Sequence, residues 1–226
     1  RVMDLGIYRL HTVPADEYTV PLPANVPSAA FPQGAGGIDP FRSYSEMFTG
    51  ETTNVTNPEL IWGTTQNVTD QQDVVFPLKL GGNSSISIPQ RIVDAYRMAD
   101  GRDIHNASAE YPYEDRPYDQ TCVTTADKQL SKNYRLPGGT YKAYDNREPR
   151  FYASILYNDA TWIGRKLELY AGGKDNYMDF SITGQDNVHK STTGYIFRKF
   201  MDDSGKVNFT NILSGTYWTE MRLAEI

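Results

Sequence analysis

The chain has 226 residues and a mass of 25.5 kDa, with 22 basic and 28 acidic side chains, so its net charge is −6 and its pI is about 5.1. This acidic balance argues against a nucleic-acid partner, which requires a basic footprint. The mean hydropathy of −0.56 and the lack of an apolar run near the ~18 residues of a membrane helix predict no membrane span. The single cysteine, Cys122, excludes an intrachain disulfide framework and a Cys-rich zinc site.

The sequence at both ends of the chain predicts short helical segments. Residues 1–10 read as the last turn of a helix that Gly6 ends in a left-handed cap. Residues 217–226 are mostly helix formers with an apolar stripe, and no Gly, Asn or Pro ends them. We therefore interpret residues 1–226 as a single irregular domain excised from a longer chain, whose two ends are remnants of flanking helices.

The first third of the chain is predicted to form a long loop followed by a short helix. Residues 12–40 contain six prolines and several glycines, a density that predicts a long ordered loop. Ser43 and Glu46 have the spacing of a capping box, which predicts a short helix through Phe48 that ends at Gly50.

A buried strand is predicted at 59–63 and a helix from Pro89 to about Met98, with inward-facing residues Ile92, Val93 and Tyr96. The tryptophans lie among apolar neighbours, so we expect a core position for Trp62, Trp162 and Trp218.

The second half of the chain is predicted to form a loop region followed by several strands. Residues 105–145 are rich in Tyr, Pro and Asp and are predicted to be loop. The predicted strands are 151–157, 162–171 and 195–200, and the predicted turns or breaks are 158–160, 172–173 and 203–205. The fold class is therefore α+β and loop-rich, with short helices and a few antiparallel strands.

Motifs for catalysis, cofactors and metals are not found in the sequence. The three histidines lack metal-ligand spacing, and there is no nucleophile elbow, P-loop or dinucleotide fingerprint. We therefore expect no catalytic residue, no cofactor and no metal, and we interpret Cys122 as an inert buried residue. The adjacent acids Glu114–Asp115 and Asp202–Asp203 leave a surface glycoside hydrolase as the alternative function, because two carboxylates across a cleft perform that reaction.

The strongest candidate binding segment is 111–119, where three tyrosines alternate with prolines, acids and an arginine. Aromatic faces stack on the C–H patches of sugars while charged and amide groups bond hydroxyls. The candidate ligand-binding residues are Tyr111, Tyr113, Tyr118 and Arg116, with Phe76 as a further aromatic. Two alternatives remain open: the rings pack on each other to stiffen a long loop, or the aromatic loops serve assembly of a structural surface protein.

Six segments, taken in order along the chain, resemble one family. They are residues 4–10, 43–48 followed by 57–62, 89–101, 146–155, 193–200 and 222–226, the fourth with Glu148 where the family more often has Asp. Together they resemble the SusD/RagB nutrient-uptake lipoproteins of the Bacteroidetes outer membrane.

The resemblance implies a mainly α-helical parent with tetratricopeptide-like helix pairs, in which this chain is the irregular domain inserted between two pairs. It also implies glycan capture at the cell surface for polysaccharide utilisation, without catalysis, together with a SusC-like TonB-dependent transporter. The parent is then anchored in the outer membrane by a lipid. The family has no motif for its ligand residues, and Arg147, Arg150 and Glu225 are interpreted as structural, in buried arginine–carboxylate forks.

Overall fold

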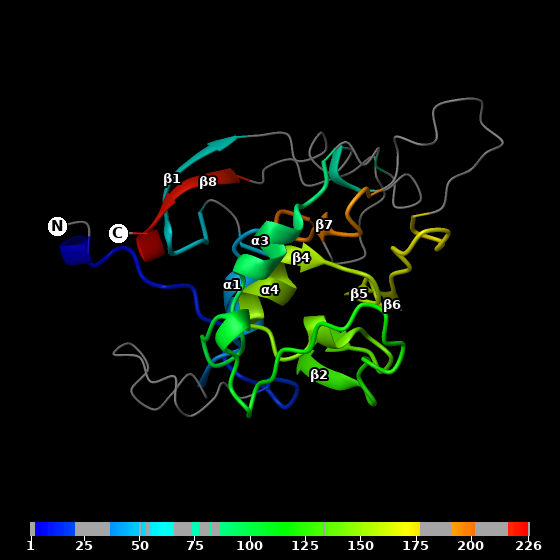
Figure 1. Ribbon diagram of the computed structural model, residues 1–226. Coiled ribbons are helices and arrows are strands. Elements are labelled where there is room, and N and C mark those ends of the chain that lie inside the picture. The colour runs from blue at the N-terminus through cyan, green and yellow to red at the C-terminus, as the bar shows by residue number, and fades with distance from the viewer. Residues whose placement is uncertain are drawn as a thin grey trace, which may run out of the picture.

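The structure is a computed structural model that describes residues 3–20, 37–49, 51–52, 55–65, 74–76, 82, 86–132, 134–176, 191–201 and 217–225. Within these residues, short helices lie among four separate two-stranded antiparallel sheets, and much of the chain is loop (Figure 1). The expected α+β, loop-rich class is confirmed.

Helix α4 (Pro149–Ser154) lies at the centre of the fold and passes directly into strand β4 (Ile155–Leu156). The prediction of a strand over 151–157 is wrong for its first four residues. Pro149 sits at the first helical position, which suits its fixed φ, and the helix buries every residue from Phe151 to Ser154. A run that is buried all round lacks the periodicity that separates helix from strand.

Helix α1 (Pro40–Ser45) packs against α4. Its N-cap is Asp39, whose carboxylate accepts a hydrogen bond from the Arg42 N–H at 2.9 Å, so the predicted cap at Ser43 is wrong. Ser43 lies inside the helix, where its buried Oγ accepts a hydrogen bond from the Val13 N–H at 2.9 Å.

Helix α3 (Gln90–Ala95) follows Pro89 as predicted but is shorter, because Tyr96 is extended with ψ 144°. Val93 is buried, whereas Ile92 is exposed, so only part of the predicted inward face is confirmed. The 3₁₀ turns η4 (Ile104–Asn106) and η5 (Lys142–Tyr144) lie in the predicted loop region.

The loop region also contains a hairpin that the sequence did not predict, β2 (Lys128–Ser131) paired with β3 (Tyr134–Leu136). Strands β5 (Thr161–Trp162) and β6 (Arg165–Lys166) form another hairpin where one long strand was predicted. Its two-residue turn has positive φ at both Ile163 and Gly164, as type I′ hairpins require.

The predicted turn at 158–160 is confirmed, with Asp159 at φ 72°, and so is the break at Gly172, with φ 85°. The predicted strand at 195–200 is confirmed in shorter form as β7 (Ile196–Phe197), which pairs with β4.

The C-terminal segment forms strand β8 (Tyr217–Arg222), followed by the 3₁₀ turn η7 (Leu223–Glu225). The predicted helix is therefore wrong over β8, since antiparallel pairing with β1 (Leu60–Thr65) outweighs a modest helix propensity. At the other end, the turn η1 (Met3–Leu5) is followed by Gly6 at φ 66°, as expected of a left-handed cap.

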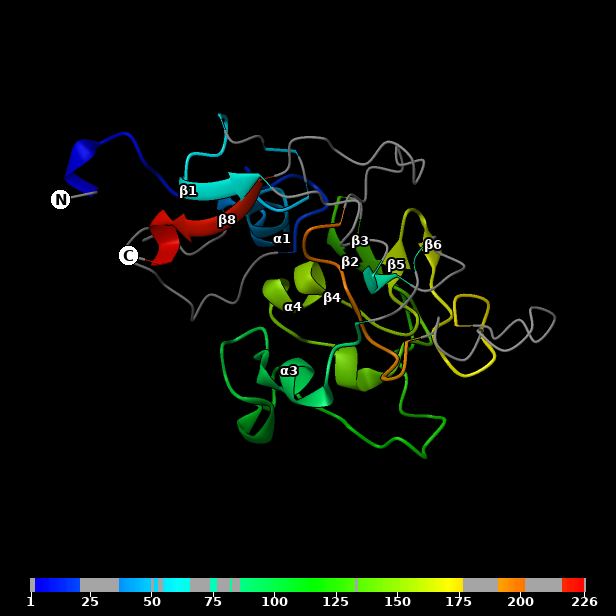
Figure 2. The same ribbon diagram turned by 90° about the horizontal axis from the view of Figure 1, so that it is seen from above.

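The β1–β8 ribbon and both chain ends lie together on one side of the molecule, away from β5 and β6, in both views (Figures 1 and 2). Trp62 on β1 is 65% exposed, so its predicted core position is wrong. Leu5, Ile7 and Met221 are exposed as well. This side of the molecule therefore presents large apolar side chains to solvent.

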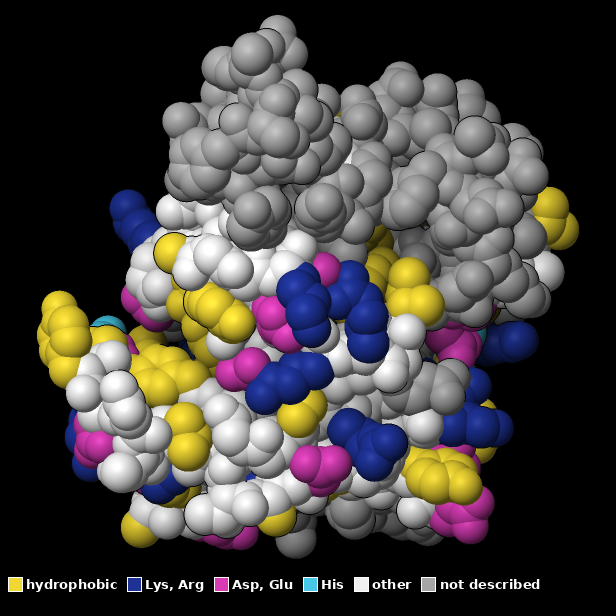
Figure 3. Space-filling model, turned by 90° about the vertical axis from the view of Figure 1, so that its right-hand side faces the viewer, with side chains coloured by type: hydrophobic (Ala, Val, Ile, Leu, Met, Phe, Trp, Pro, Cys, Tyr) yellow, Lys and Arg dark blue, Asp and Glu magenta, His cyan; other side chains and the backbone are white. Residues whose placement is uncertain are grey.

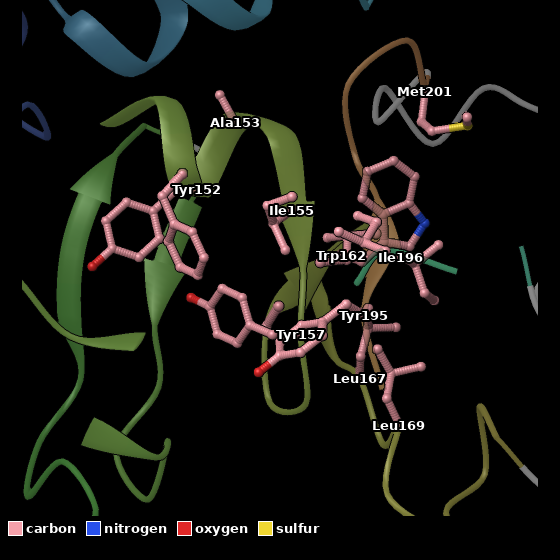
Figure 4. Packing of buried hydrophobic residues seen from close by; sticks show 14 of the residues in the cluster. Tyr152, Ala153, Ile155, Tyr157, Trp162, Leu167, Leu169, Tyr195, Ile196 and Met201 are labelled. Atoms are coloured by element: carbon pink, nitrogen blue, oxygen red, sulfur yellow. The ribbon is translucent and has the colours of Figure 1, made fainter. Parts of the chain in front are cut away.

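The core is aromatic and surrounds α4 and β4 (Figure 4). Phe151 and Tyr157 stack with ring centroids 5.3 Å apart, and the Tyr157 hydroxyl lies 3.1 Å from that of Tyr134. Buried Arg198 lies over Tyr134 at 4.5 Å, which gives the cation a favourable site inside the core. Trp162 is buried, which confirms its predicted core position.

Several predicted features lie outside the described residues: Gly50, the turn at 203–205, the acid pair Asp202–Asp203 and the side chains of Trp218 and Glu225. Among the described residues, no helix is both long and apolar enough to cross a membrane.

Candidate functional site

A cavity of about 430 Å³ opens where the start of α1, strand β2 and the segment before α4 meet. We name it the Tyr111 cavity. Its apolar lining comes from Val20, Pro40, Phe41, Leu130, Pro149 and Tyr152. A volume of this size, with a largely apolar lining and a few polar groups, is typical of small-molecule sites.

The polar groups of the Tyr111 cavity include a charge pair. Lys128 on β2 donates from Nζ to Oδ2 of Asp145 at 2.5 Å. The Lys128 side chain is about half exposed, whereas that of Asp145 is mostly buried. Gln129 and Asn146 add amide groups, and Asn146 Nδ2 donates to the Pro112 carbonyl at 3.3 Å.

The wall formed by the residues before α4 is held by hydrogen bonds to the chain that follows α3. The Ala99 N–H donates to the Asn146 carbonyl at 2.7 Å, and the Glu148 N–H donates to the Arg97 carbonyl at 2.9 Å. Asn146 has φ 56°, a left-handed conformation that Asn tolerates better than most residues. This turn brings Ala99 and Asn146 together in the lining.

Arg147 is almost fully buried in this wall and also lines the cavity. Its guanidinium donates to three backbone carbonyls, those of Ala143 at 3.2 Å, Val93 at 2.7 Å and Tyr96 at 2.8 Å. It also lies 4.6 Å from the centroid of Phe151, and burial lowers its pKa. The structural interpretation of Arg147 fits this position, but the expected carboxylate fork is wrong, because its acceptors are carbonyl groups.

Arg150, in the same motif, is exposed and pairs with Glu148 at 2.6 Å, so it forms no buried fork. An arginine–carboxylate fork does occur elsewhere: Arg165, which is half exposed, donates to both oxygens of the almost fully buried Asp175, at 2.6 and 2.8 Å.

Of the predicted ligand-binding residues, Tyr111 lines the Tyr111 cavity. Its N–H donates to Ser108 Oγ at 3.1 Å, and Ser108 Oγ in turn donates to Asp100 Oδ2 at 2.7 Å. Partial burial raises the pKa of the Tyr111 hydroxyl, and the adjacent Glu110 carboxylate raises it further. The ring is therefore held at the cavity as a neutral phenol at physiological pH.

Tyr113 is half buried, and its ring lies 5.7 Å from the Arg147 guanidinium. Burial, with a contribution from Asp115, raises the pKa of Tyr113 to about 12. Tyr113 does not line either described cavity. Its contacts are those expected of a packing residue.

The other candidates lie apart from the Tyr111 cavity. Tyr118 is 98% exposed and lines neither described cavity, and Arg116 pairs with Glu114 at 2.8 Å and with Asp119. Phe76 is buried in the core, with its ring edge-on to Trp162 at 5.5 Å. The prediction that Phe76 binds a ligand is therefore wrong, because other core residues of the same chain cover its ring.

The acid pair considered for hydrolysis is engaged within its loop. Glu114 accepts hydrogen bonds from Lys142 at 2.7 Å and from Arg116, which hold its pKa below the usual value. Asp115 accepts a hydrogen bond from the Tyr141 hydroxyl. Asp145 is the one carboxylate among the described residues that line the Tyr111 cavity.

Cys122 is buried with its thiol unbridged, which confirms its predicted burial. Within the described part of the chain, no group of three His, Cys, Asp or Glu side chains is placed to hold a metal ion.

Most residues of the Tyr111 cavity were not predicted. Phe41 and Lys128 come from parts of the chain far from Tyr111, and no spacing in the sequence relates them. The available signal was the family-like segment 146–155, four of whose residues line the cavity.

The family model described as "SusD family" matches residues 58–226, three quarters of the chain. The chain belongs to the SusD family. No curated protein matches it.

Two solved structures share the fold of this SusD-family chain. BT4246 is 18% identical with a TM-score of 0.59, and the match covers 99% of this chain and 38% of BT4246. A SusD-like carbohydrate binding protein from Bacteroides fragilis NCTC 9343 is 22% identical with a TM-score of 0.51, and the match covers 80% of this chain and 30% of that protein. The chain therefore corresponds to a minor part of these two longer chains.

Proposed function

We propose that this SusD-family chain binds a glycan, an oligosaccharide or polysaccharide, at the Tyr111 cavity. The observation that carries the proposal is the combination of an apolar floor, a tyrosine wall and the Lys128–Asp145 pair in one cavity of about 430 Å³. A sugar ring has apolar C–H faces and hydroxyl edges, which these two kinds of surface complement. The fold shared with a SusD-like carbohydrate binding protein supports the same ligand class.

The wider role follows from the family and is part of the proposal. The protein captures glycans at the bacterial cell surface for nutrient uptake and passes them to a SusC-like TonB-dependent transporter. Its parent is held at the outer membrane by a lipid anchor. Within that parent, the chain acts as a domain between helix pairs, and the exposed apolar side chains of the β1–β8 ribbon support a packing surface there.

The proposed role is binding without catalysis. The carboxylate of Asp145 is paired with Lys128, and hydrolysis of a glycosidic bond requires two carboxyl groups across the bond. Release of shorter sugars by the purified chain, abolished by Asp145→Asn, would contradict this part of the proposal.

The binding experiment measures affinity for a panel of soluble polysaccharides by isothermal titration calorimetry, first for the chain and then for its variants. Tyr111→Ala is expected to weaken binding about tenfold, because a stacked aromatic contributes roughly 1–1.5 kcal/mol. Tyr118→Ala is the matched control, since this tyrosine is 98% exposed and lines neither described cavity. Equal loss of affinity in both variants, or no binding to any glycan, would overturn the proposal.

A further inference from the structure

Residues 111–119, which we name the strap, lie against the segment 141–147 that carries one wall of the Tyr111 cavity. Of the strap residues, Tyr111 lines this cavity. A second cavity, of about 540 Å³, lies between residues 169–176 and 191–194 and is lined by no strap residue. In Figure 2 the bright green chain that contains the strap lies on the side of the molecule away from the β1–β8 ribbon. Movement of the strap therefore affects the Tyr111 cavity directly.

Local hydrogen bonds anchor the strap at its two ends. The Tyr111 N–H donates to Ser108 Oγ at 3.1 Å, and the Cys122 N–H donates to the Asp119 carbonyl at 2.9 Å. Between these anchors, no backbone–backbone hydrogen bond joins residues 112–118 to another described part of the chain. A segment held in this way opens at a lower free-energy cost than the helices and strands of the core.

Two side chains of the segment 141–147 hold the middle of the strap. Lys142 Nζ donates to Glu114 Oε1 at 2.7 Å, and the Tyr141 hydroxyl donates to the Asp115 carboxylate. The side chains of Lys142 and Glu114 are each about one-third exposed. Because water and salt ions compete for such a charge pair, it stabilises the closed strap only weakly.

The closed strap supports the cavity wall. Asn146 Nδ2 donates to the Pro112 carbonyl at 3.3 Å, and the Tyr113 ring lies 5.7 Å from the Arg147 guanidinium. Asn146 and Arg147 both line the Tyr111 cavity. Opening of the strap breaks both contacts, so the wall is fully supported only while the strap is closed.

The strap is braced internally, which favours movement as one body. Arg116 pairs with Glu114 at 2.8 Å and with Asp119, and the Asp119 N–H donates to the Arg116 carbonyl at 2.9 Å. Pro112 and Pro117 restrict the backbone further. These contacts lie within the strap itself, so they persist when it opens.

The single cysteine of the chain provides a reporter for opening. Cys122 is completely buried, and its thiol donates to the Glu114 carbonyl of the strap at 3.8 Å. A reagent can modify a cysteine only when it reaches the sulfur atom. In the folded chain, modification of Cys122 therefore reports that the strap has opened.

We propose that the strap is a movable cover of the Tyr111 cavity wall, latched by the Lys142–Glu114 and Tyr141–Asp115 contacts, and that its opening and closing control entry to the cavity. The control of entry rests on the proposed function, whereas the opening itself does not. Hydrogen bonds from Lys142 and Arg116 hold the pKa of Glu114 below its usual value, so the latch stays charged at neutral pH. Salt is therefore the variable that weakens it.

The test measures how fast dithiodipyridine, a neutral aromatic disulfide, modifies Cys122 in the folded chain. Lys142→Met and Glu114→Gln are each expected to raise this rate about fivefold, because each removes one charge of the latch. Raising the salt concentration from about 0.05 M to about 0.5 M should raise the rate of the unaltered chain about threefold and that of Glu114→Gln much less. Rates that neither the variants nor salt change overturn the latch.

Lys166→Met is the matched control. Its partly exposed ion pair with Asp159, at 2.9 Å, lies on the β5–β6 side of the molecule. Figure 3 views that side and shows cations and acids interspersed over it. This variant should leave the thiol rate within about twofold of the unaltered chain. A rise equal to that of Lys142→Met would show that general destabilisation exposes Cys122, and would overturn the proposal.

Dilute urea separates opening of the strap from unfolding of the whole chain. Local opening exposes little surface, so the thiol rate should hardly change up to about 1 M urea. A rate that increases with urea in parallel with global unfolding overturns the proposal.

A glycan whose binding is weakened by Tyr111→Ala then tests the control of entry. At about ten times its Kd, such a glycan should slow the thiol reaction about tenfold, because it binds the closed state alone. An unchanged rate with the glycan bound overturns the control of entry and leaves the proposed function standing. Absence of binding to any glycan overturns the proposed function and the control of entry, while the variants and urea still decide whether the strap opens.

Discussion

Ser131 Oγ donates a hydrogen bond of 2.6 Å to Oδ2 of Asp39, across 92 residues of sequence, and both residues are completely buried. The same carboxylate caps α1 through the Arg42 N–H and accepts from Thr19 Oγ1 at 3.2 Å. One acid therefore ties together the N-terminal segment, α1 and β2. Each of these three elements contributes residues to the Tyr111 cavity, including Val20.

Replacing Asp39 is expected to damage both stability and the cavity. Asp39→Ala leaves the helix cap and the hydroxyls of Ser131 and Thr19 without their acceptor, so the free energy of unfolding should fall by about 3 kcal/mol. Urea denaturation measures this loss. Asp127→Ala is the control, because its pair with Arg135 and its hydrogen bond from the Gly138 N–H are both exposed, so its loss should cost only about 1 kcal/mol. Similar losses in the two variants would contradict this role of Asp39.

Two arginines three residues apart in one motif should behave differently. Arg147→Lys removes most of three hydrogen bonds to buried carbonyls, and the free energy of unfolding should fall by about 3 kcal/mol. Arg150→Lys alters only an exposed ion pair and should change it by less than about 0.5 kcal/mol. Denaturation curves of the two variants under one set of conditions decide the question, and a larger loss for Arg150→Lys would refute the assignment.

We expect replacement of a buried and of an exposed tryptophan to have different effects on stability. Trp162→Ala should cost about 3–5 kcal/mol of unfolding free energy, because it empties a buried site between Phe76 and Arg198. Trp62→Ala should cost less than about 0.5 kcal/mol, since the ring is 65% exposed. Urea denaturation of the two variants under the same conditions measures both losses. A strongly destabilised Trp62→Ala variant would show that the ring is part of the core.

The buried tyrosines predict alkaline instability. Burial raises the pKa of Tyr113 to about 12 and holds those of Tyr144 and Tyr157 well above the usual value. In the unfolded chain these phenols lose their protons near pH 10, whereas in the folded chain they keep them. Above about pH 10 the folded state thus binds more protons, so the free energy of unfolding falls as pH rises through the folded pKa values.

Melting temperatures measured by circular dichroism from about pH 8 to about pH 11 test this dependence. The melting temperature should be nearly constant at the lower end and fall above about pH 10. Tyr157→Phe should flatten the fall, because it removes one phenol that must stay neutral in the core. A melting temperature that stays constant through about pH 11 would contradict the prediction.

Local features of the fold followed from the sequence wherever a residue's own backbone preference decides the geometry. Gly6 ends a helical turn, Asp159 lies in the predicted turn and Gly172 at the predicted break, both with positive φ, and Pro89 precedes a helix. These preferences act within a few residues and need no partner from elsewhere in the chain. The ordered motifs likewise identified the SusD family, whose model matches residues 58–226.

The candidate site followed only in part. The aromatic density of 111–119 pointed to Tyr111, which does line a cavity, but it equally pointed to Tyr113 and Tyr118, which do not. Sequence composition shows that the segment contains aromatic rings. Which of these rings faces a cavity depends on the residues that pack against the segment in the folded chain. Tyr113 packs beside Arg147, and nothing in the local sequence reveals that contact.

By itself, then, the sequence determined the loop-rich α+β class, the turns and the family. Only the tertiary structure decided that residues 149–154 form a helix and that residues 217–222 form a strand paired with β1. It also decided that Asp39, in a segment predicted to be loop, is buried and accepts hydrogen bonds from distant parts of the chain. The physical reason is that these outcomes depend on partners far away in the chain. Burial on all sides removes the periodicity that distinguishes helix from strand, and pairing with a distant strand outweighs the small propensities of individual residues.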